Sequence, residues 1–167
     1  MLDKDLSKVL YIDLTKRKFW IENREDLFSK YIGGSGVAIN LLHEECPKGI
    51  DSFHPDNPII FAVGPLTGLF PLCSKTIAMF KSPLTGNLGE SHAGGRSAIS
   101  IRMAGYGAIV IKGSSDEPIY LSIYNNKVDF KLASGIWGVR SSYTVGRILR
   151  EREKGEGIRT IMRIGKA

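Results

Sequence analysis

The sequence predicts an α+β fold, and three observations favour it. Of the 167 residues, 43% are hydrophobic and 24% are charged, which is the balance of an ordinary globular domain. Short apolar or alternating runs typical of strands recur along the chain, with a few short helical patterns between them. The 19 glycines lie in discrete clusters, so several tight turns are expected. Mostly strands with few helices favour α+β over a doubly wound sheet, and we expect residues 1–167 to form a single domain.

The N-terminal segment predicts a β-hairpin followed by a helix. Apolar and aromatic residues indicate strands at Val9–Leu14 and Phe19–Glu22, and the run Thr15–Lys18 forms the turn between them. Asn23 stands where a helix N-cap would, with Asp26 three residues later, and apolar side chains then follow at helical spacing. We therefore expect a first helix that begins next to Asn23.

A second helix and two strands are expected next. Gly33–Gly36 should end the first helix and open another over Val37–Glu45, which Pro47 ends. The run Pro58–Val63 is apolar on both faces, which is typical of a central strand. Lys75–Lys81 alternates enough to predict another strand.

The stretch after this strand is less regular. Asn87–Ala93 is polar, and no strand or helix is assigned to it. Arg96–Met103 predicts a short helix that Gly105 closes. Ala108–Ile111 is a short apolar run and predicts a core strand.

The C-terminal third predicts a hairpin, a helix and a last strand. Alternation over Ile119–Tyr124 and Val128–Leu132 indicates a hairpin with one solvent-exposed face. Its turn contains Asn125 and Asn126, because asparagine accepts the positive φ that such a turn needs. A helix capped by one of the serines at 141 and 142 should run to about Glu153. A final strand is expected at Ile158–Ile164.

Charge and cysteine content bear on the partners and the location. The net charge is +6, but mixed signs over residues 150–154 are typical of a solvated helix face, and no nucleic-acid-binding signature accompanies them. No apolar run has the length of a signal peptide or a membrane span. Cys46 and Cys73 lack the spacing of a zinc site or a disulfide framework. We expect a cytoplasmic protein with reduced thiols and with neither nucleic acid nor membrane as a partner.

Backbone-rich segments are the main candidates for a site. The histidines and cysteines do not combine into a nucleophile with a base, so no catalytic residue is assigned. Gly33–Gly36 and Gly94–Gly95 each precede a predicted helix, where free N–H groups and the helix dipole favour anions. The first cluster lacks the lysine of a P-loop and does not follow a strand, so a purely structural pair of helix caps is the alternative.

Six linked motifs resemble one known family. The chain is similar, from about Lys8 onward, to the N-terminal domain of the tungsten-containing aldehyde:ferredoxin oxidoreductases. The motifs that carry this resemblance are Tyr31–Gly36, Gly64–Gly68, Lys81–Gly86, Ala93–Gly95, Ala104–Gly113 and Ile136–Gly138. The resemblance implies two β-sheets with short helices, which together form a base for a bis-pterin tungsten or molybdenum cofactor.

The same resemblance implies where this cofactor would lie. Lys75 occupies the position of a basic residue, usually arginine, that the family presents to the cofactor. A lysine keeps the positive charge but lacks the bidentate fork of arginine. His92 stands where a main-chain carbonyl binds a magnesium ion that bridges the two pterin phosphates. Ala93, Gly94 and Gly95 fall where the family's backbone meets the pterin.

The family also has parts that this sequence lacks. The cysteines of its 4Fe–4S cluster, in CxxCxxxC spacing, and its proton-transfer residues belong to later domains, and no such spacing occurs here. The resemblance thus implies part of an enzyme that oxidises aldehydes to carboxylic acids and passes electrons to ferredoxin, not active alone and truncated relative to the family's N-terminal domain. Its partners would be the remaining oxidoreductase domains or a second subunit.

Other interpretations of this chain stay open. It could be a split subunit, a degenerate relic, or a non-catalytic module that binds pterin or a partner protein. Apolar surface that relatives bury against later domains would favour a symmetric homodimer of the isolated chain.

Overall fold

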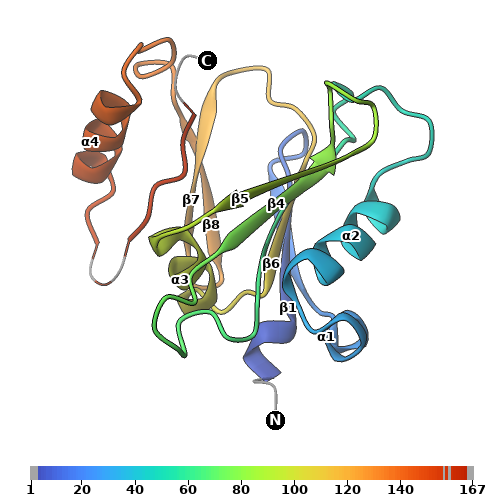
Figure 1. Cartoon of the computed structure of the whole chain (residues 1–167). Helices are drawn as coiled ribbons and strands as arrows, with labels where there is room; N and C mark the ends of the chain where they lie inside the picture. Colours follow the sequence, from blue (N-terminus) through green and yellow to red (C-terminus); the bar gives the residue numbers. More distant parts are fainter. Residues whose placement is uncertain (1–3, 156, 158, 165–167) are drawn as a thin grey trace.

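The computed structural model describes residues 4–155, 157 and 159–164, and these residues form an α+β fold as predicted (Figure 1). A six-stranded sheet has the strand order β2-β1-β6-β3-β4-β5, and β7 and β8 form a second, two-stranded sheet. The strands are β1 (Lys8–Asp13), β2 (Lys18–Asn23), β3 (Ile59–Val63), β4 (Thr76–Lys81), β5 (Leu88–Ala93), β6 (Ala108–Lys112), β7 (Ile119–Tyr124) and β8 (Lys127–Leu132). The helices are the 3₁₀-helix η1 (Lys4–Ser7), α1 (Glu25–Tyr31), α2 (Gly34–Glu45), α3 (Arg96–Met103) and α4 (Ser142–Arg152).

The centre of the large sheet is made by strands far apart in sequence. Strand β6 runs parallel to β1 and antiparallel to β3, so that Ile109 pairs with Leu10 on one side and with Phe61 on the other. The other neighbouring strands of this sheet are antiparallel. Strand β3 lies between β6 and β4, which confirms the central strand predicted from its apolar run.

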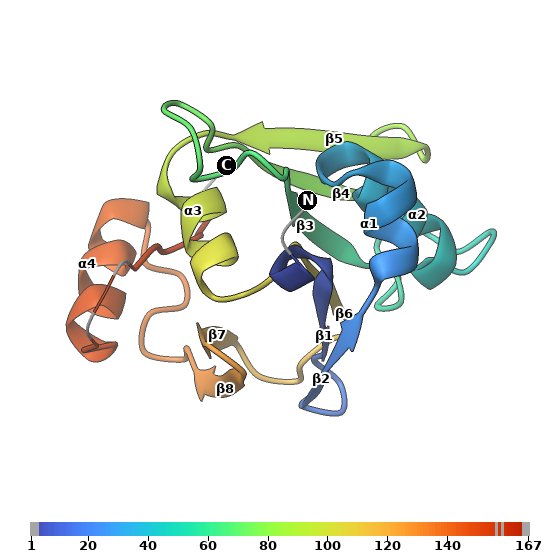
Figure 2. The ribbon, with the colours of Figure 1, turned by 90° about the horizontal axis from the view of Figure 1, so that it is seen from below.

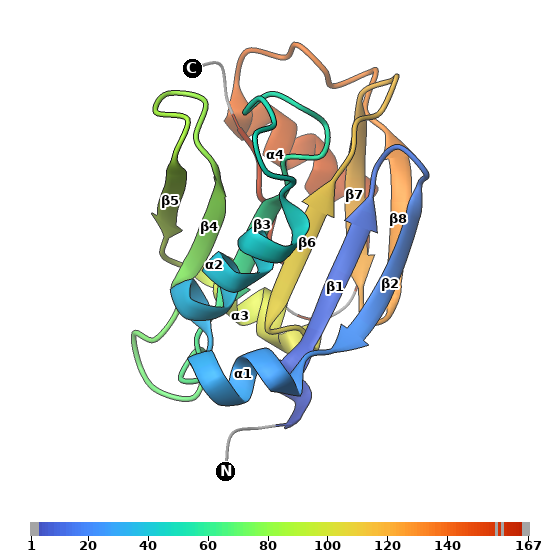
Figure 3. The same ribbon diagram turned by 90° about the vertical axis from the view of Figure 1, so that its right-hand side faces the viewer.

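Both faces of the large sheet are covered (Figures 2 and 3). Alternate residues of β1 point to opposite faces, as a strand requires: Val9 packs in a cluster with residues of α1 and α2, whereas Leu10 packs with residues of α3 and β8. Helices α1 and α2 therefore cover one face, and α3 together with the β7–β8 hairpin covers the other. No helix in the described part of the chain is long and apolar enough to cross a bilayer.

Helix α4 is attached to the β7–β8 hairpin rather than to the large sheet. A small cluster of Ala133, Ile136 and Leu149 fixes its apolar side. At its C-terminal end, the Glu153 carboxylate accepts hydrogen bonds from Tyr120, Ser122 and Lys131, at 2.7 to 3.1 Å. This network ties the helix to both strands of the hairpin.

Two expectations from the sequence were wrong, and one strand was missed. Asn23 does not cap α1: it is the last residue of β2 and its side chain accepts a hydrogen bond from Ser7, while α1 begins at Glu25 without a side-chain cap. Residues 88–93 form strand β5, which pairs with β4 over its whole length. Its residues are mostly exposed because it is an edge strand, and this explains the polar sequence.

The second wrong expectation concerns the C-terminal end. Ile158 lies outside the described residues, and residues 159–164 form no strand. Ile161 packs against the α4 cluster instead, which accounts for the apolar character of this segment.

Of the two serines predicted as candidates for the N-cap of α4, Ser141 is the cap, because its hydroxyl accepts a hydrogen bond from the Thr144 N–H. At the β7–β8 turn only Asn125 of the two asparagines has positive φ, at 49°.

Gly107 is the tightest point of the sheet. Its N–H donates to the Lys8 carbonyl of β1, and its carbonyl accepts from the Val63 N–H of β3, at 2.9 and 3.0 Å. A Cβ at this position would lie 1.9 Å from the Leu6 carbonyl oxygen and 2.5 Å from the Phe28 ring. Only glycine fits here, since these neighbours include backbone that is itself held in the core.

Replacing Gly107 with alanine should unfold or strongly destabilise the domain. The added methyl group has to displace both the N-terminal backbone and the Phe28 ring, which should cost about 3 kcal/mol or more. Gly64→Ala is the matched control, because no atom lies within 4 Å of its Cβ position and its φ is not positive. Urea unfolding followed by circular dichroism measures both variants. Equal midpoints for the two would contradict this account of the sheet.

Glu153→Gln should weaken the attachment of α4 in a pH-dependent way. The Lys131 ammonium holds the pKa of the Glu153 carboxyl below its ordinary value of 4.5. A carboxyl with a lowered folded-state pKa stabilises the fold above its unfolded pKa, and this contribution is lost as the pH falls through the folded value. The variant should lose about 1 kcal/mol at pH 7 and match the parent in acid. Glu151→Gln, an exposed neighbour, should change neither value.

Candidate functional site

The site residues predicted from the sequence come together at one end of the β4–β5 pair. Thr76, the first residue of β4, pairs with Ala93, the last residue of β5. Lys75 directly precedes Thr76, and Gly94 and Gly95 directly follow Ala93. The register therefore brings to one edge of the sheet residues that are about twenty positions apart in sequence.

A buried hydrogen bond fixes the glycine turn at this edge. The hydroxyls of Thr76 and Ser97 lie 2.7 Å apart, and the two residues are only 2% and 9% exposed. Ser97 is the second residue of α3, so this bond links the start of β4 to the start of α3 on either side of Gly94 and Gly95. The two glycines are thus held between two anchored elements.

The space next to the two glycines is open. A Cβ added to Gly94 or Gly95 would meet no atom of the described chain within 4 Å, and both residues are exposed. Gly95 has a positive φ of 98°, and this backbone conformation explains why a glycine occupies the position. Nothing within the described residues requires a glycine at Gly94, which is the arrangement expected where a group from outside approaches the backbone closely.

Lys75 adds a positive charge to this edge. Its side chain is exposed and forms no ion pair with the described residues. An ammonium group on a flexible stem can reach an anion over the glycine turn, although with less directional control than a guanidinium. The residues present therefore fit a phosphate-bearing group lying against the backbone of Ala93, Gly94 and Gly95.

His92 belongs to a polar chain that crosses to α2. Its Nε2 lies 2.9 Å from Glu90 Oε1, and the Ser35 hydroxyl donates to the same oxygen at 2.6 Å. The Ser35 hydrogen bond, with the positive potential of His92, lowers the pKa of the Glu90 carboxyl. His92 lies on the edge strand β5 and pairs with Ile77 of β4. Along an edge strand, alternate residues direct their carbonyls away from the sheet.

The Gly33–Gly36 cluster has a structural explanation. A Cβ at Gly36 would lie 2.8 Å from the Tyr31 carbonyl oxygen, and one at Gly33 would lie 3.1 Å from the Val63 carbonyl oxygen. The carboxylate of Glu90 is the anion beside the N-terminus of α2, through its bond from Ser35. These observations favour the pair of helix caps over a phosphate cradle at this cluster.

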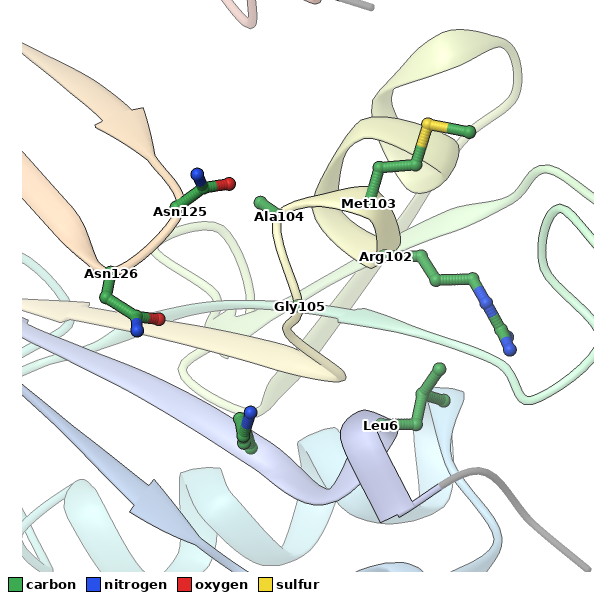
Figure 4. Close-up of a pocket in the computed structure, with 8 residues that line it drawn as sticks. Leu6, Arg102, Met103, Ala104, Gly105, Asn125 and Asn126 are labelled. Carbon is green, nitrogen blue, oxygen red and sulfur yellow. The ribbon is translucent and has the colours of Figure 1, made fainter.

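A separate hollow of about 460 Å³ lies at the other end of α3 (Figure 4). Its lining includes Lys8 and Arg102, together with the turn asparagines Asn125 and Asn126. Arg102 is already engaged, since its guanidinium donates to the Pro65 carbonyl at 2.8 Å. Because α3 rises about 12 Å over its eight residues, this hollow is distinct from the glycine turn.

No side-chain metal centre is present in the described residues. Within residues 4–155, 157 and 159–164, no three histidine, cysteine, aspartate or glutamate side chains are placed to hold a metal ion together. Cys46 and Cys73 are unpaired and partly buried. A metal ion at this edge would have to bind main-chain or ligand oxygens.

Sequence reasoning missed Ser35 and Glu90. They are 55 residues apart and come from two segments that had been assigned to different features, a glycine cluster and an irregular stretch. No local pattern links them. Recognising β5 as a strand would have been the only signal, because it places Glu90 and His92 on the same face.

Comparison with protein families gives a match over nearly the whole chain. Residues 9–167 match the family described as aldehyde ferredoxin oxidoreductase, N-terminal domain. A tungsten-containing aldehyde ferredoxin oxidoreductase of Pyrococcus abyssi is 36% identical over 162 residues, which are 96% of this chain and 26% of the relative. An enzyme of the same description from Pyrococcus furiosus is 37% identical over 131 residues, which are 78% of this chain and 22% of the relative.

Two further similarities involve proteins with other names. An aliphatic sulfonate oxidoreductase, WOR-like subunit, of Pyrococcus furiosus is 31% identical over 86% of this chain and 24% of its own length. The solved active site complex BamBC of benzoyl coenzyme A reductase, in complex with 1,5-dienoyl-CoA, has a TM-score of 0.83 at 32% identity. That similarity covers 87% of this chain and 22% of the solved chain. The chain thus spans about a quarter of the length of these relatives.

Breaking the hydroxyl pair beneath the glycine turn should destabilise the domain. Thr76→Val leaves the buried Ser97 hydroxyl without its partner, and the expected loss is about 1 to 3 kcal/mol. Thr76→Val combined with Ser97→Ala should cost less than the two single changes added together, because the unpaired hydroxyl is gone. Denaturant unfolding of the four proteins measures the coupling. Additive effects would show that the bond does not hold the turn.

Proposed function

The chain belongs to the aldehyde ferredoxin oxidoreductase N-terminal domain family, and from this premise we propose that it forms the base for a bis-pterin tungsten or molybdenum cofactor. The observation that carries the proposal is Gly94. It lies between two anchored elements, and nothing in the described chain requires a glycine there. Close approach of the pterin to the backbone would explain why position 94 is a glycine.

The proposal assigns a part to each residue of the edge. The backbone of Ala93, Gly94 and Gly95 would lie against the pterin, and the ammonium group of Lys75 would neutralise one of its phosphates. The main-chain carbonyl of His92 would bind a magnesium ion between the phosphates, for which a hard oxygen donor is suitable. The side chain of His92 is held aside by Glu90, at 2.9 Å.

The names of the relatives support a role for this domain in binding a cofactor that reactions on different substrates have in common. Proteins named for aldehydes, for aliphatic sulfonates and for benzoyl coenzyme A all contain a region similar to this chain. A domain common to such different substrates is better suited to holding a cofactor than to selecting a substrate. We therefore assign substrate recognition to parts of the protein outside residues 9–167.

We further propose that the whole protein is an oxidoreductase that converts an aldehyde to a carboxylic acid and passes the electrons to ferredoxin. When bound, the metal–pterin group supplies the two-electron redox chemistry. This domain contributes binding, orientation and charge neutralisation, and the cluster ligands and proton-transfer groups come from other domains or from a second subunit. On its own, the domain should not oxidise aldehydes.

The test joins this domain to the rest of a relative. The region of the Pyrococcus furiosus enzyme that is similar to this chain is replaced with the corresponding residues of this chain, and the chimera is produced with tungstate under anaerobic conditions. Tungsten is measured by mass spectrometry, and pterin by the fluorescence of its oxidised form. Gly94→Val should lower both contents about tenfold or more, because its side chain occupies the space that the pterin needs.

Controls separate cofactor loss from misfolding. Gly155→Val introduces the same side chain at another glycine whose Cβ position meets no atom within 4 Å, and it should retain the cofactor. Lys75→Gln should lower the content less than Gly94→Val, and Lys48→Gln should have no effect. A folded Gly94→Val chimera with full tungsten, or a folded parent chimera with none, would contradict the proposal.

A further inference from the structure

The loop between β3 and β4 presents apolar side chains to solvent. Val63 at the end of β3 pairs with Thr76 at the start of β4, so residues 64–74, the apolar loop, leave and re-enter the sheet at neighbouring points. The loop contains no charged residue. Its large apolar side chains are exposed rather than packed in the domain: Leu66, Leu69, Phe70 and Leu72. So many exposed apolar groups in one short segment mark an interaction surface.

Hydrogen bonds hold the apolar loop in one conformation. The Gly68 N–H donates to the Cys73 carbonyl across the loop, at 2.8 Å. The Arg102 guanidinium of α3 donates to the Pro65 carbonyl, also at 2.8 Å, and Thr67 is buried. The exposed side chains therefore stand on a fixed backbone, which suits recognition of a partner better than a loose linker would.

Leu72 has a strained conformation that its packing does not explain. Its φ is 66°, in the left-handed region that glycine and asparagine adopt at the least cost. Its side chain is fully exposed, so leucine gains no burial in return. Strained residues of this kind persist where a further interaction uses them.

Ile32 combines the same two features beside the apolar loop. Its φ of 68° and ψ of −40°, with a hydrogen bond of 2.7 Å from the Gly33 N–H to the Tyr31 carbonyl, define a γ-turn of the strained type. A β-branched residue is an outlier there, and its side chain is 59% exposed. A Cβ at Gly33 would lie 3.2 Å from the Pro65 ring, so the γ-turn lies against the start of the loop. Figures 1 and 3 show α1, which the γ-turn follows, and the loop at the same end of the sheet.

We propose that the apolar loop and Ile32 form a docking surface for the rest of the oxidoreductase, in the same chain or in a second subunit. Most of each relative's length lies outside the region similar to this chain, and this part supplies the partner surface. A loop without charges is buried against an apolar protein surface without stranding an ion. The loop leads directly into Lys75, so the docked part would also extend over the proposed cofactor edge. The inference rests on the proposed division of the enzyme into domains, but not on cofactor binding at Gly94.

The melting temperature of the 167-residue chain tests the strain. Leu72→Asn should raise it by about 2 °C, because asparagine accepts a positive φ and no packing is lost. Leu84→Asn is the matched control, since Leu84 is 93% exposed but has no positive φ, and it should not raise the melting temperature.

Hydrogen exchange followed by mass spectrometry tests the docking. The amides of residues 64–74 should exchange about tenfold more slowly in the chimera described above than in the 167-residue chain. In the chimera the effect of Leu72→Asn should reverse, with exchange of the loop about tenfold faster than in the parent chimera. Leu84→Asn should leave this rate unchanged. Gly94→Val should also leave it unchanged while removing the cofactor, which separates a failure of docking from a failure of the proposed function.

Five results would overturn the proposal. Equal exchange in the chain and the chimera means that nothing docks on the loop, and a lower melting temperature for Leu72→Asn means that the domain itself uses this leucine. Protection that rises with the concentration of the isolated chain assigns the surface to a second copy. Protection that appears only with phosphatidylcholine vesicles assigns it to a membrane. Protection lost in Gly94→Val but kept in Leu72→Asn assigns it to the cofactor.

Discussion

The backbone of Gly107 joins the two halves of the large sheet at the point where β6 begins. Its N–H and carbonyl bond to β1 and to β3, and the chain before β1 passes so close that no side chain could be accommodated. Strands β1 and β6 are parallel neighbours although about one hundred residues separate them. Closing so long a loop has an entropic cost that only a well-packed junction offsets. Residues of both core clusters, Phe28 on one side and Tyr106 on the other, lie next to this junction in space or in sequence.

This central junction leaves the candidate site at the periphery. From β3 the sheet continues outward through β4 to β5, and the order of strands makes β5 an edge. An edge strand has backbone groups that no neighbour uses, which is a liability in an isolated sheet but an advantage where a ligand or another domain binds. The buried bond between Thr76 and Ser97 then gives this edge the rigidity that the exposed residues themselves cannot provide.

Apolar periodicity predicted the strands and helices that face the core, because burial imposes the pattern that the sequence displays. The prediction of α3 matched the structure at both ends, and β3 was recognised as central from its apolar run. The same reasoning failed for β5, since an edge strand exposed on both faces has no pattern to display. The hydrogen bond from Ser7 to Asn23 and the one from Ser35 to Glu90 were missed because tertiary contacts create them.

The site proposed for the cofactor consists mainly of backbone, and such a site is compatible with the 31 to 37% identity between this chain and its relatives. Contacts made by carbonyl and N–H groups survive changes of side chain, so the main-chain role proposed for His92 does not depend on its imidazole. What such a site requires is the course of the chain: a glycine where the group comes close, a positive φ at Gly95, and an anchored strand and helix on either side. Side chains such as Lys75 then change the charge of the proposed site without defining its shape. On the proposed function, a small number of glycines and buried hydroxyls fix the shape of this domain's site, and differences in substrate arise from the regions of the protein that cover it.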